Sequence, residues 1–170
     1  MSAIVTAPAG RGAMPGVKGK GVLVTGGTSG IGQAIAVKFA EYGANVAINY
    51  LRTAEEAADT ERQVNACVNR VQREGVRDVL VQGDVSQEDQ VGAMVSKAVK
   101  ELGGLDVLVN NAGIQISRHS HELSSDHFDK VLAVNLRGAF LCAREAIKHF
   151  LAEGKPGVII NVSSVHQLIP

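Results

Sequence analysis

The stretch VLVTGGTSGIG, residues 22–32, joins an apolar strand, a glycine-rich turn and the start of a helix. Gly26, Gly30 and Gly32 allow the backbone to turn tightly and to approach a ligand with no Cβ in the way. Free amide groups and the positive end of the following helix then converge on one point, which suits a phosphate group. The spacing is neither G-x-G-x-x-G nor a Walker A loop, so the pattern alone leaves open a turn that binds no ligand.

The composition indicates one domain with a hydrophobic core. The chain has 170 residues, of which 45% are hydrophobic and 20% are charged, as in ordinary globular domains. Lys plus Arg equals Asp plus Glu at 17 each, so the charge points to neither nucleic acid nor membrane as a partner. No apolar run reaches the roughly 18 residues of a spanning helix, and no secretion signal is recognisable. We expect a cytoplasmic protein with a disordered tail (residues 1–18) and one domain (residues 19–170).

The cysteines and histidines carry no motif of their own. Cys67 and Cys142 lie far apart, without a C-x-x-C pattern or a histidine cluster, so we expect buried reduced thiols, no disulfide and no metal site. His119, His121 and His166 are assigned no catalytic role, because a lone loop histidine more often packs or faces solvent.

Apolar strands alternate with helical stretches along the chain. Strands are expected at residues 22–24, 45–50, 78–82, 105–109 and 157–162. One helix is expected directly after the glycine turn, and three more at residues 54–74, 86–102 and 126–151. We expect an apolar stripe of Ile31, Ala34, Ile35 and Phe39 on the first helix, a capping box at Ser86, and a kink near Asn135. Such alternation predicts an α/β, Rossmann-type doubly wound parallel sheet in three αβα layers, with ligands at the carboxyl ends of the strands.

Each distinctive motif follows a predicted strand: the glycine turn, Asp84-Val85, Asn110-Asn111-Ala112-Gly113 and Ser163-Ser164. In a parallel sheet these positions share one edge. Asp84 alone is also explained as a turn or capping residue. Together, and in this order, the motifs resemble the short-chain dehydrogenase/reductase family, whose TGxxxGIG form matches residues 25–32. The resemblance covers residues 18–170, and its last part, residues 160–170, is similar to bacterial glucose dehydrogenases.

The resemblance implies a role for each matching residue. Asp84 and the Val85 backbone would contact the adenine. Asn135 would hold the active-site lysine through water, and Ser164, with Ser163 as second choice, would hydrogen-bond the reacting oxygen of the substrate. The pyrophosphate turn would comprise Gly26, Thr28, Ser29, Gly30, Ile31 and Gly32, and the ribose would lie against Asn111, Ala112 and Gly113.

The position after the second strand bears on the cofactor. An NAD-specific site needs an acid about 20 residues after the glycine turn, where this chain has Tyr50, Leu51 and Arg52. No carboxylate there repels a 2′-phosphate, and Arg52 can pair with one. We therefore expect NADP as cofactor, with NAD as the alternative.

The sequence departs from the family at its end. The proton-donating Tyr-x-x-x-Lys motif would fall about thirteen residues after Ser164, whereas the chain stops after six, and Tyr42 and Tyr50 are its two tyrosines. The last strands of the fold are missing too. We expect this chain alone to be inactive, and we interpret it as part of a longer enzyme, a truncated gene product or a domain completed by another chain.

The resemblance implies an NAD(P)-dependent oxidoreductase that moves a hydride between nicotinamide and an alcohol or carbonyl substrate, a sugar such as glucose being favoured. The alternatives are a 3-oxoacyl carrier-protein reductase and a non-catalytic dinucleotide-binding fragment. Family members commonly pair through the helix expected here at residues 126–151, so a homo-oligomer, a tetramer, is expected for the full-length form.

Overall fold

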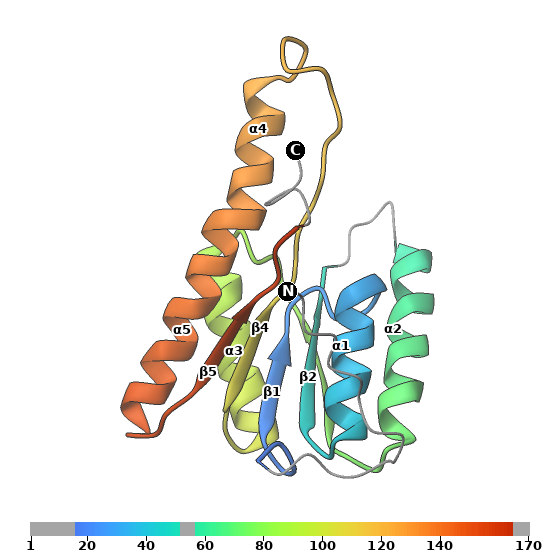
Figure 1. Cartoon of the computed structure of the whole chain (residues 1–170), viewed down its shortest axis with the longest axis vertical. Helices are drawn as coiled ribbons and strands as arrows, with labels where there is room; N and C mark the ends of the chain where they lie inside the picture. The colour runs from blue at the N-terminus through green and yellow to red at the C-terminus, as the bar shows by residue number, and fades with distance from the viewer. Residues whose placement is uncertain (1–15, 52–56, 165–170) are drawn as a thin grey trace, which may run out of the picture.

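Five strands form one sheet in which every neighbouring pair is parallel, as predicted (Figure 1). The structure is a computed structural model that describes residues 16–51 and 57–164. The sheet has the order β3-β2-β1-β4-β5. Its strands are β1 (Gly21–Val24), β2 (Asn45–Tyr50), β3 (Asp78–Gln82), β4 (Val107–Asn110) and β5 (Val158–Asn161). The doubly wound α/β fold predicted from the alternation of elements is therefore confirmed.

The helices cover the two faces of this sheet. On one face, α1 and α2 pack against β1 and β2, with residues such as Ala36, Val37 and Val71 buried against Val22 and Val46. On the other face, α3 and α5 pack against the sheet. The helices are α1 (Gly30–Glu41), α2 (Ala57–Gln72), α3 (Glu88–Leu102), α4 (Ser125–Leu132) and α5 (Ala139–Ala152).

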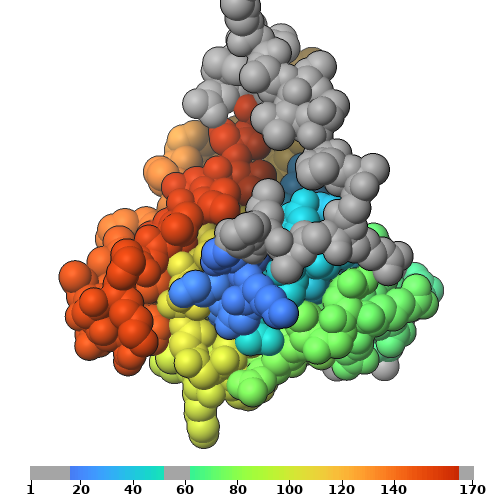
Figure 2. All heavy atoms as spheres, turned by 60° about the horizontal axis from the view of Figure 1, so that its bottom comes forward, coloured from blue at the N-terminus to red at the C-terminus, as the bar shows by residue number. Residues whose placement is uncertain are grey.

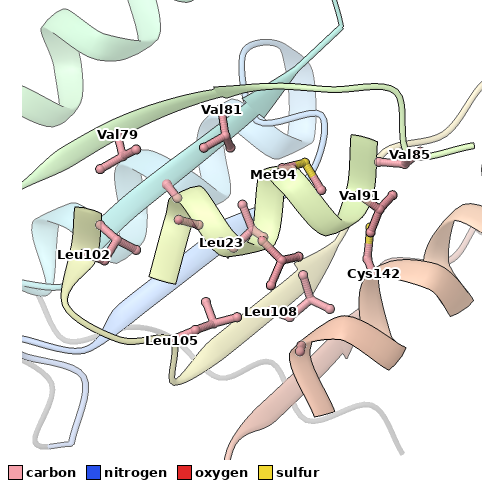
Figure 3. Packing of buried hydrophobic residues seen from close by; sticks show 14 of the residues in the cluster. Leu23, Val79, Val81, Val85, Val91, Met94, Leu102, Leu105, Leu108 and Cys142 are labelled. Atoms are coloured by element: carbon pink, nitrogen blue, oxygen red, sulfur yellow. The ribbon is translucent and has the colours of Figure 1, made fainter. Parts of the chain in front are cut away.

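The second core lies between α3, α5 and the sheet (Figure 3). Met94 and Val91 of α3 point toward Leu23 and Leu108 of the strands, and Cys142 of α5 points toward Val91. Burying such side chains away from water is the main favourable term in folding, at about 25 cal/mol per Å² of apolar surface. The two cores cover β1 on both faces, whereas β5 at the edge of the sheet is largely exposed, with Val158 at 55% and Ile160 at 40%.

The first helix packs differently from the prediction. Ile31 is 66% exposed, and the face that enters the core carries Gly32, Ala36, Val37 and Ala40. Of the predicted stripe, Ile35 and Phe39 are partly buried and pack against the edge of this core, whereas Ile31 and Ala34 are exposed. The prediction is therefore confirmed for Ile35 and Phe39 and wrong for Ile31 and Ala34.

Two other local predictions need correction. Helix α3 begins at Glu88 with Gln87 as N-cap, so Ser86 stands one residue too early for a capping box. Its hydroxyl donates to Asp84 Oδ1 at 2.8 Å and accepts from Gln87 Nε2 at 3.1 Å. Strand β4 begins two residues later than predicted, at Val107, because the Asp106 carboxylate accepts a hydrogen bond from the Gly21 amide at 2.9 Å. In both places a short acidic side chain accepts hydrogen bonds in the loop that precedes the element.

The long helix predicted over residues 126–151 contains a π-helical segment, η1 (Ala133–Gly138), between α4 and α5. Asn135, where a kink was predicted, lies inside it. Short π-helical segments often mark functional sites because they change the direction in which side chains leave a helix. Helix α4 extends beyond the carboxyl edge of the sheet (Figure 1) and buries none of its residues.

Within the described part of the chain, no helix combines the length and the hydropathy that crossing a membrane requires.

Candidate functional site

The turn between β1 and α1 has the backbone that its glycines allow. Gly26 and Gly30 have φ values of +59° and +51°, a region that favours glycine. A Cβ at Gly32 would lie 2.2 Å from the Gly26 oxygen and 2.4 Å from Asn111 Nδ2, so this position has no room for a side chain. The start of α1 is thus packed directly against the turn.

The amino end of α1 fits an anionic ligand. The first amides of an α-helix have no partner inside the helix and carry the positive end of its dipole. Ser29, the N-cap, has an extended backbone, and its hydroxyl makes no capping hydrogen bond. A Cβ at Gly30 would meet nothing within 4 Å, so there is open space beside the first residue of the helix. These features suit the pyrophosphate of a dinucleotide.

Thr25, which the sequence reasoning missed, connects the turn to the loop after β4. It is 1% exposed. Its Oγ1 accepts hydrogen bonds from the amides of Asn111, at 2.9 Å, and Ala112, at 3.0 Å, and donates to the Val109 carbonyl at 3.3 Å. The Asn111 side chain completes the connection by donating to the carbonyls of Thr25, at 2.9 Å, and Gly26, at 3.2 Å. Two of the motifs found in the sequence are therefore joined into one unit.

The loop after β3 holds Asp84 in a turn of its own. Asp84 Oδ1 accepts from both the amide and the hydroxyl of Ser86, each at 2.8 Å, and the Asp84 amide donates to Gln90 Oε1 at 2.9 Å. Val85 is 6% exposed and belongs to the core beneath this loop. These contacts are those of the turn interpretation, and the Asp84 carbonyl is used in the same turn, where it accepts from the Gln87 amide at 3.1 Å.

The other candidate residues border a cleft of about 750 Å³ at the same edge. Asn135 accepts a hydrogen bond from the Ile114 amide at 2.8 Å and donates to the Ile114 carbonyl at 2.9 Å, so η1 fixes the loop after Gly113. The cleft brings together parts of α1, the loop after β4, α4, η1 and the end of β5. It is lined by Ile31, Gly113, Ile114, Gln115, Ile116, Leu123, Phe128, Val131, Asn135, Ser163 and Ser164.

Not every predicted residue lies at this cleft. Tyr50 ends β2, where its carbonyl accepts from the Gly83 amide at 3.0 Å, and Thr28 is 6% exposed beneath the turn. Tyr42 is at the opposite end of α1, at the amino edge. Arg52 and His166 lie outside the described residues.

Both cysteines are buried free thiols, as predicted. Burial raises the pKa of Cys67 to about 11 and that of Cys142 to about 12. Since the thiolate is the nucleophile, neither side chain is reactive near neutral pH. Cys67 has a structural contact instead, because its thiol donates to the Gly27 carbonyl at 3.3 Å beneath the glycine turn.

Comparison with known proteins places this arrangement in a family. The sequence model described as short chain dehydrogenase matches residues 20–170, which includes every motif at the carboxyl edge. The chain belongs to the short-chain dehydrogenase family. The resemblance inferred from the motifs is thereby confirmed.

Two curated relatives of this short-chain dehydrogenase chain carry different substrate names. It is 42% identical over 154 residues to "3beta-hydroxysteroid dehydrogenase 1" of Eggerthella lenta, covering 91% of this chain and 56% of the relative. It is 43% identical over 152 residues to "Glucose 1-dehydrogenase" of Gluconobacter oxydans, covering 89% and 54%. The chain therefore spans about half the length of the curated relatives it matches.

Solved structures of the family share the fold. A short chain dehydrogenase of Burkholderia cenocepacia in complex with NADP superimposes with a TM-score of 0.78 at 34% identity, over 91% of this chain and 59% of that one. A short-chain type dehydrogenase/reductase of Mycobacterium marinum has a TM-score of 0.81 at 30% identity, over 91% and 60%.

Proposed function

We propose that this chain forms the dinucleotide-binding part and one wall of the substrate cleft of an NAD(P)-dependent oxidoreductase acting on a CH–OH or carbonyl group. The observation that carries the proposal is the convergence of the glycine turn, the Asn111 loop, Asn135 and Ser164 around one cleft. Ile31, the exposed second residue of α1, lines the same cleft as Ser164, so a dinucleotide on the turn would direct its nicotinamide toward the serine.

The proposed roles follow from chemistry. When bound, the nicotinamide supplies the hydride acceptor or donor. Ser164 orients the reacting oxygen of the substrate by a hydrogen bond, and Asn135 keeps the loop at Ile114 in place. Asp84 and Val85 would contact the adenine, and Asn111 to Gly113 the ribose. Neither Tyr42 nor Tyr50 lines the cleft, so residues 1–170 alone should bind cofactor without turnover. Detectable turnover by this chain would contradict that expectation.

NADP is the proposed cofactor, with NAD as the alternative. No carboxylate occurs at residues 50–52, where an acid would bind the ribose 2′-OH of NAD, and Arg52 can pair with a 2′-phosphate. The structure of the Burkholderia relative contains NADP. Dissociation constants for NADPH and NADH measured by fluorescence titration test the preference, and tighter binding of NADH would overturn it.

For the substrate, we propose a sugar such as glucose, because of the similarity of residues 160–170 to glucose dehydrogenases and the name of the Gluconobacter relative. A specific observation supports a second candidate. Most side chains lining the cleft are apolar, including Ile114, Ile116, Leu123 and Phe128, and apolar walls suit an acyl chain, as in a 3-oxoacyl carrier-protein reductase, or a steroid. Turnover of glucose, acetoacetyl thioester and a 3β-hydroxysteroid by the full-length protein separates these candidates.

A homo-oligomer is proposed for the full-length enzyme. The outward face of the long helix carries exposed Leu132, Leu136 and Phe140, at 39%, 66% and 59% exposure, beside a shallow groove. Exposed apolar patches of this kind commonly mark protein interfaces. Light scattering of the full-length protein and of a Leu136→Glu variant tests this: the variant should dissociate, and an unchanged mass would contradict the assignment of this face. A tetramer is the expected wild-type form.

A further inference from the structure

Asn49 is a buried amide that follows three buried apolar residues of β2. It is the penultimate residue of β2, it is 2% exposed, and its neighbour Ile48 is fully buried. An amide side chain placed in such surroundings is costly unless it forms hydrogen bonds. Its partners therefore explain why this position is polar.

The side chain connects the glycine turn to the end of β3. Asn49 Oδ1 accepts a hydrogen bond from the Gly26 amide at 3.1 Å, while Nδ2 donates to the carbonyls of Val81, at 3.2 Å, and Gly83, at 3.0 Å. The main-chain carbonyl of Asn49 also accepts from the Gly27 amide at 2.8 Å. Because the two donor bonds fix the plane of the amide group, its oxygen is held in the direction of Gly26.

This arrangement divides the amides of the turn into two sets. Those of Gly26 and Gly27 point back at Asn49 and are occupied. The amides nearer α1 belong to the open helix end, where a phosphate fits. The conformation that presents the second set thus depends on the anchoring of the first.

We infer that Asn49 is a positioning residue for the dinucleotide: it holds the first half of the glycine turn so that the amides of its second half face the pyrophosphate. The inference rests on the proposed function, since it needs a dinucleotide on this turn. Asn49 acts through Gly26 and is not expected to touch the ligand.

Asn45 provides a matched control in the same strand. It lies at the opposite end of β2, where its Oδ1 accepts from the Arg77 amide at 3.0 Å and its Nδ2 donates to the Gly19 carbonyl at 3.4 Å. Asn45→Ala therefore removes comparable side-chain to backbone bonds far from the turn. Both variants are compared with the wild type by NADPH titration and by urea unfolding without ligand.

We expect Asn49→Ala to raise the dissociation constant for NADPH about tenfold or more, which corresponds to about 1.4 kcal/mol of binding free energy. Asn45→Ala should lower stability toward urea and keep the wild-type affinity. If Asn49→Ala binds NADPH with the wild-type affinity, the role of Asn49 is structural only. That result would overturn the inference and leave the proposed function standing. Absence of NADPH binding by the wild type would overturn the proposed function, and the inference with it.

Asn49→Asp is the second variant, in case alanine prevents folding. Aspartate keeps the shape and an acceptor for Gly26 but faces the carbonyls of Val81 and Gly83 with an oxygen in place of a donor. It also places a carboxylate behind an anion-binding turn. Its affinity for NADPH should fall at least as far as that of the alanine variant, and an unchanged dissociation constant would overturn the inference.

Discussion

The two edges of the sheet use similar residue types in different surroundings. All the polar side chains that are buried in the described part of the chain lie at the carboxyl edge; they are Thr25, Thr28, Asn49, Ser86 and Asn110. At the amino edge, which Figure 2 brings forward, the segment before β1 (blue) lies beside the connection from α3 to β4 (yellow). There the Lys20–Asp106 ion pair and the Asn45–Arg77 hydrogen bond are exposed to solvent.

This difference shows where the molecule depends on polar contacts. A buried hydrogen bond costs about 1–3 kcal/mol when one partner is removed, because the other partner stays unsatisfied. An exposed ion pair contributes about 0–1 kcal/mol, since water replaces the lost partner. Polar substitutions at the carboxyl edge should therefore affect both ligand binding and stability, and those at the amino edge should affect stability weakly.

The strongest test of the comparison is Gly32→Ala. The new Cβ would overlap the Gly26 carbonyl and Asn111 Nδ2, which the network holds in place, so the turn must shift. We expect loss of measurable NADPH binding and a clear fall in melting temperature. Gly92→Ala in α3 is the control: its Cβ would meet nothing within 4 Å, and alanine should stabilise the helix by about 1 kcal/mol. Equal behaviour of the two variants would refute the role of close packing at Gly32.

A somewhat smaller effect is expected for Thr25→Val. Valine keeps the shape but leaves the amides of Asn111 and Ala112 without their acceptor. We expect a loss of about 1–3 kcal/mol in the free energy of unfolding, from two partly buried amides left without an acceptor, together with weaker NADPH binding. Urea denaturation measures the first, and Thr25→Ser, which retains the hydroxyl, should recover most of it. A valine variant as stable as the wild type would remove the basis for a buried network here.

Asp84→Ala separates the two interpretations of that carboxylate. A lost hydrogen bond to adenine should weaken NADPH binding by a factor of about two to ten, the equivalent of 0.5–1.5 kcal/mol. If Asp84 serves only the turn with Ser86, the melting temperature should fall while the dissociation constant stays at its wild-type value. Ser86→Ala is the matched control, since it removes one hydrogen bond of the turn and keeps the carboxylate.

The smallest effect is expected at the amino edge, for Asp106. Burial opposes ionisation there, but the hydrogen bonds from Lys20 and the Gly21 amide together lower the pKa of this carboxyl below its ordinary 3.8. A lowered folded-state pKa stabilises the protein above the unfolded-state pKa, and this contribution is lost as the pH falls through the folded-state value.

Asp106→Asn should therefore cost about 0–1 kcal/mol at neutral pH and should remove part of the stability loss below about pH 4. Urea denaturation across this pH range measures both effects. A loss at Asp106 as large as that at Thr25 would contradict the contrast between the edges.

The fold was predictable because its signals are local and repeated. Five apolar runs separated by helical stretches predict a parallel sheet, and the strand bounds differ from prediction by at most two residues. The candidate residues at the carboxyl edge were found because they belong to motifs. Thr25 and Asn49 were missed because their importance lies in partners about 85 and 23 residues away, which no local pattern records. At Asn49 the available signal was an amide directly after the apolar run Val46-Ala47-Ile48.

The packing face of α1 could not be predicted for a different reason. Hydrophobicity favoured Ile31 and Phe39, but the buried face is centred on Gly32, Ala36 and Ala40, with Phe39 at its edge and Ile31 exposed. The capping box at Ser86 failed for a local reason: the helix begins at Glu88 with Gln87 as N-cap, and the Ser86 hydroxyl bonds Asp84 and Gln87, its neighbours in the sequence.

The π-helical segment η1 also divides the long helix into two parts with different opening behaviour. Residues of α5 such as Leu141 and Ala146 are fixed in the core, whereas α4 buries none. Local opening is easiest where few apolar contacts must be broken. The backbone amides of α4 should therefore exchange with deuterium well before those of α5, with the boundary inside η1. In this one helix, α5 would exchange slowly because it is anchored in the core. Helix α4, which forms a wall of the cleft, would open independently of it.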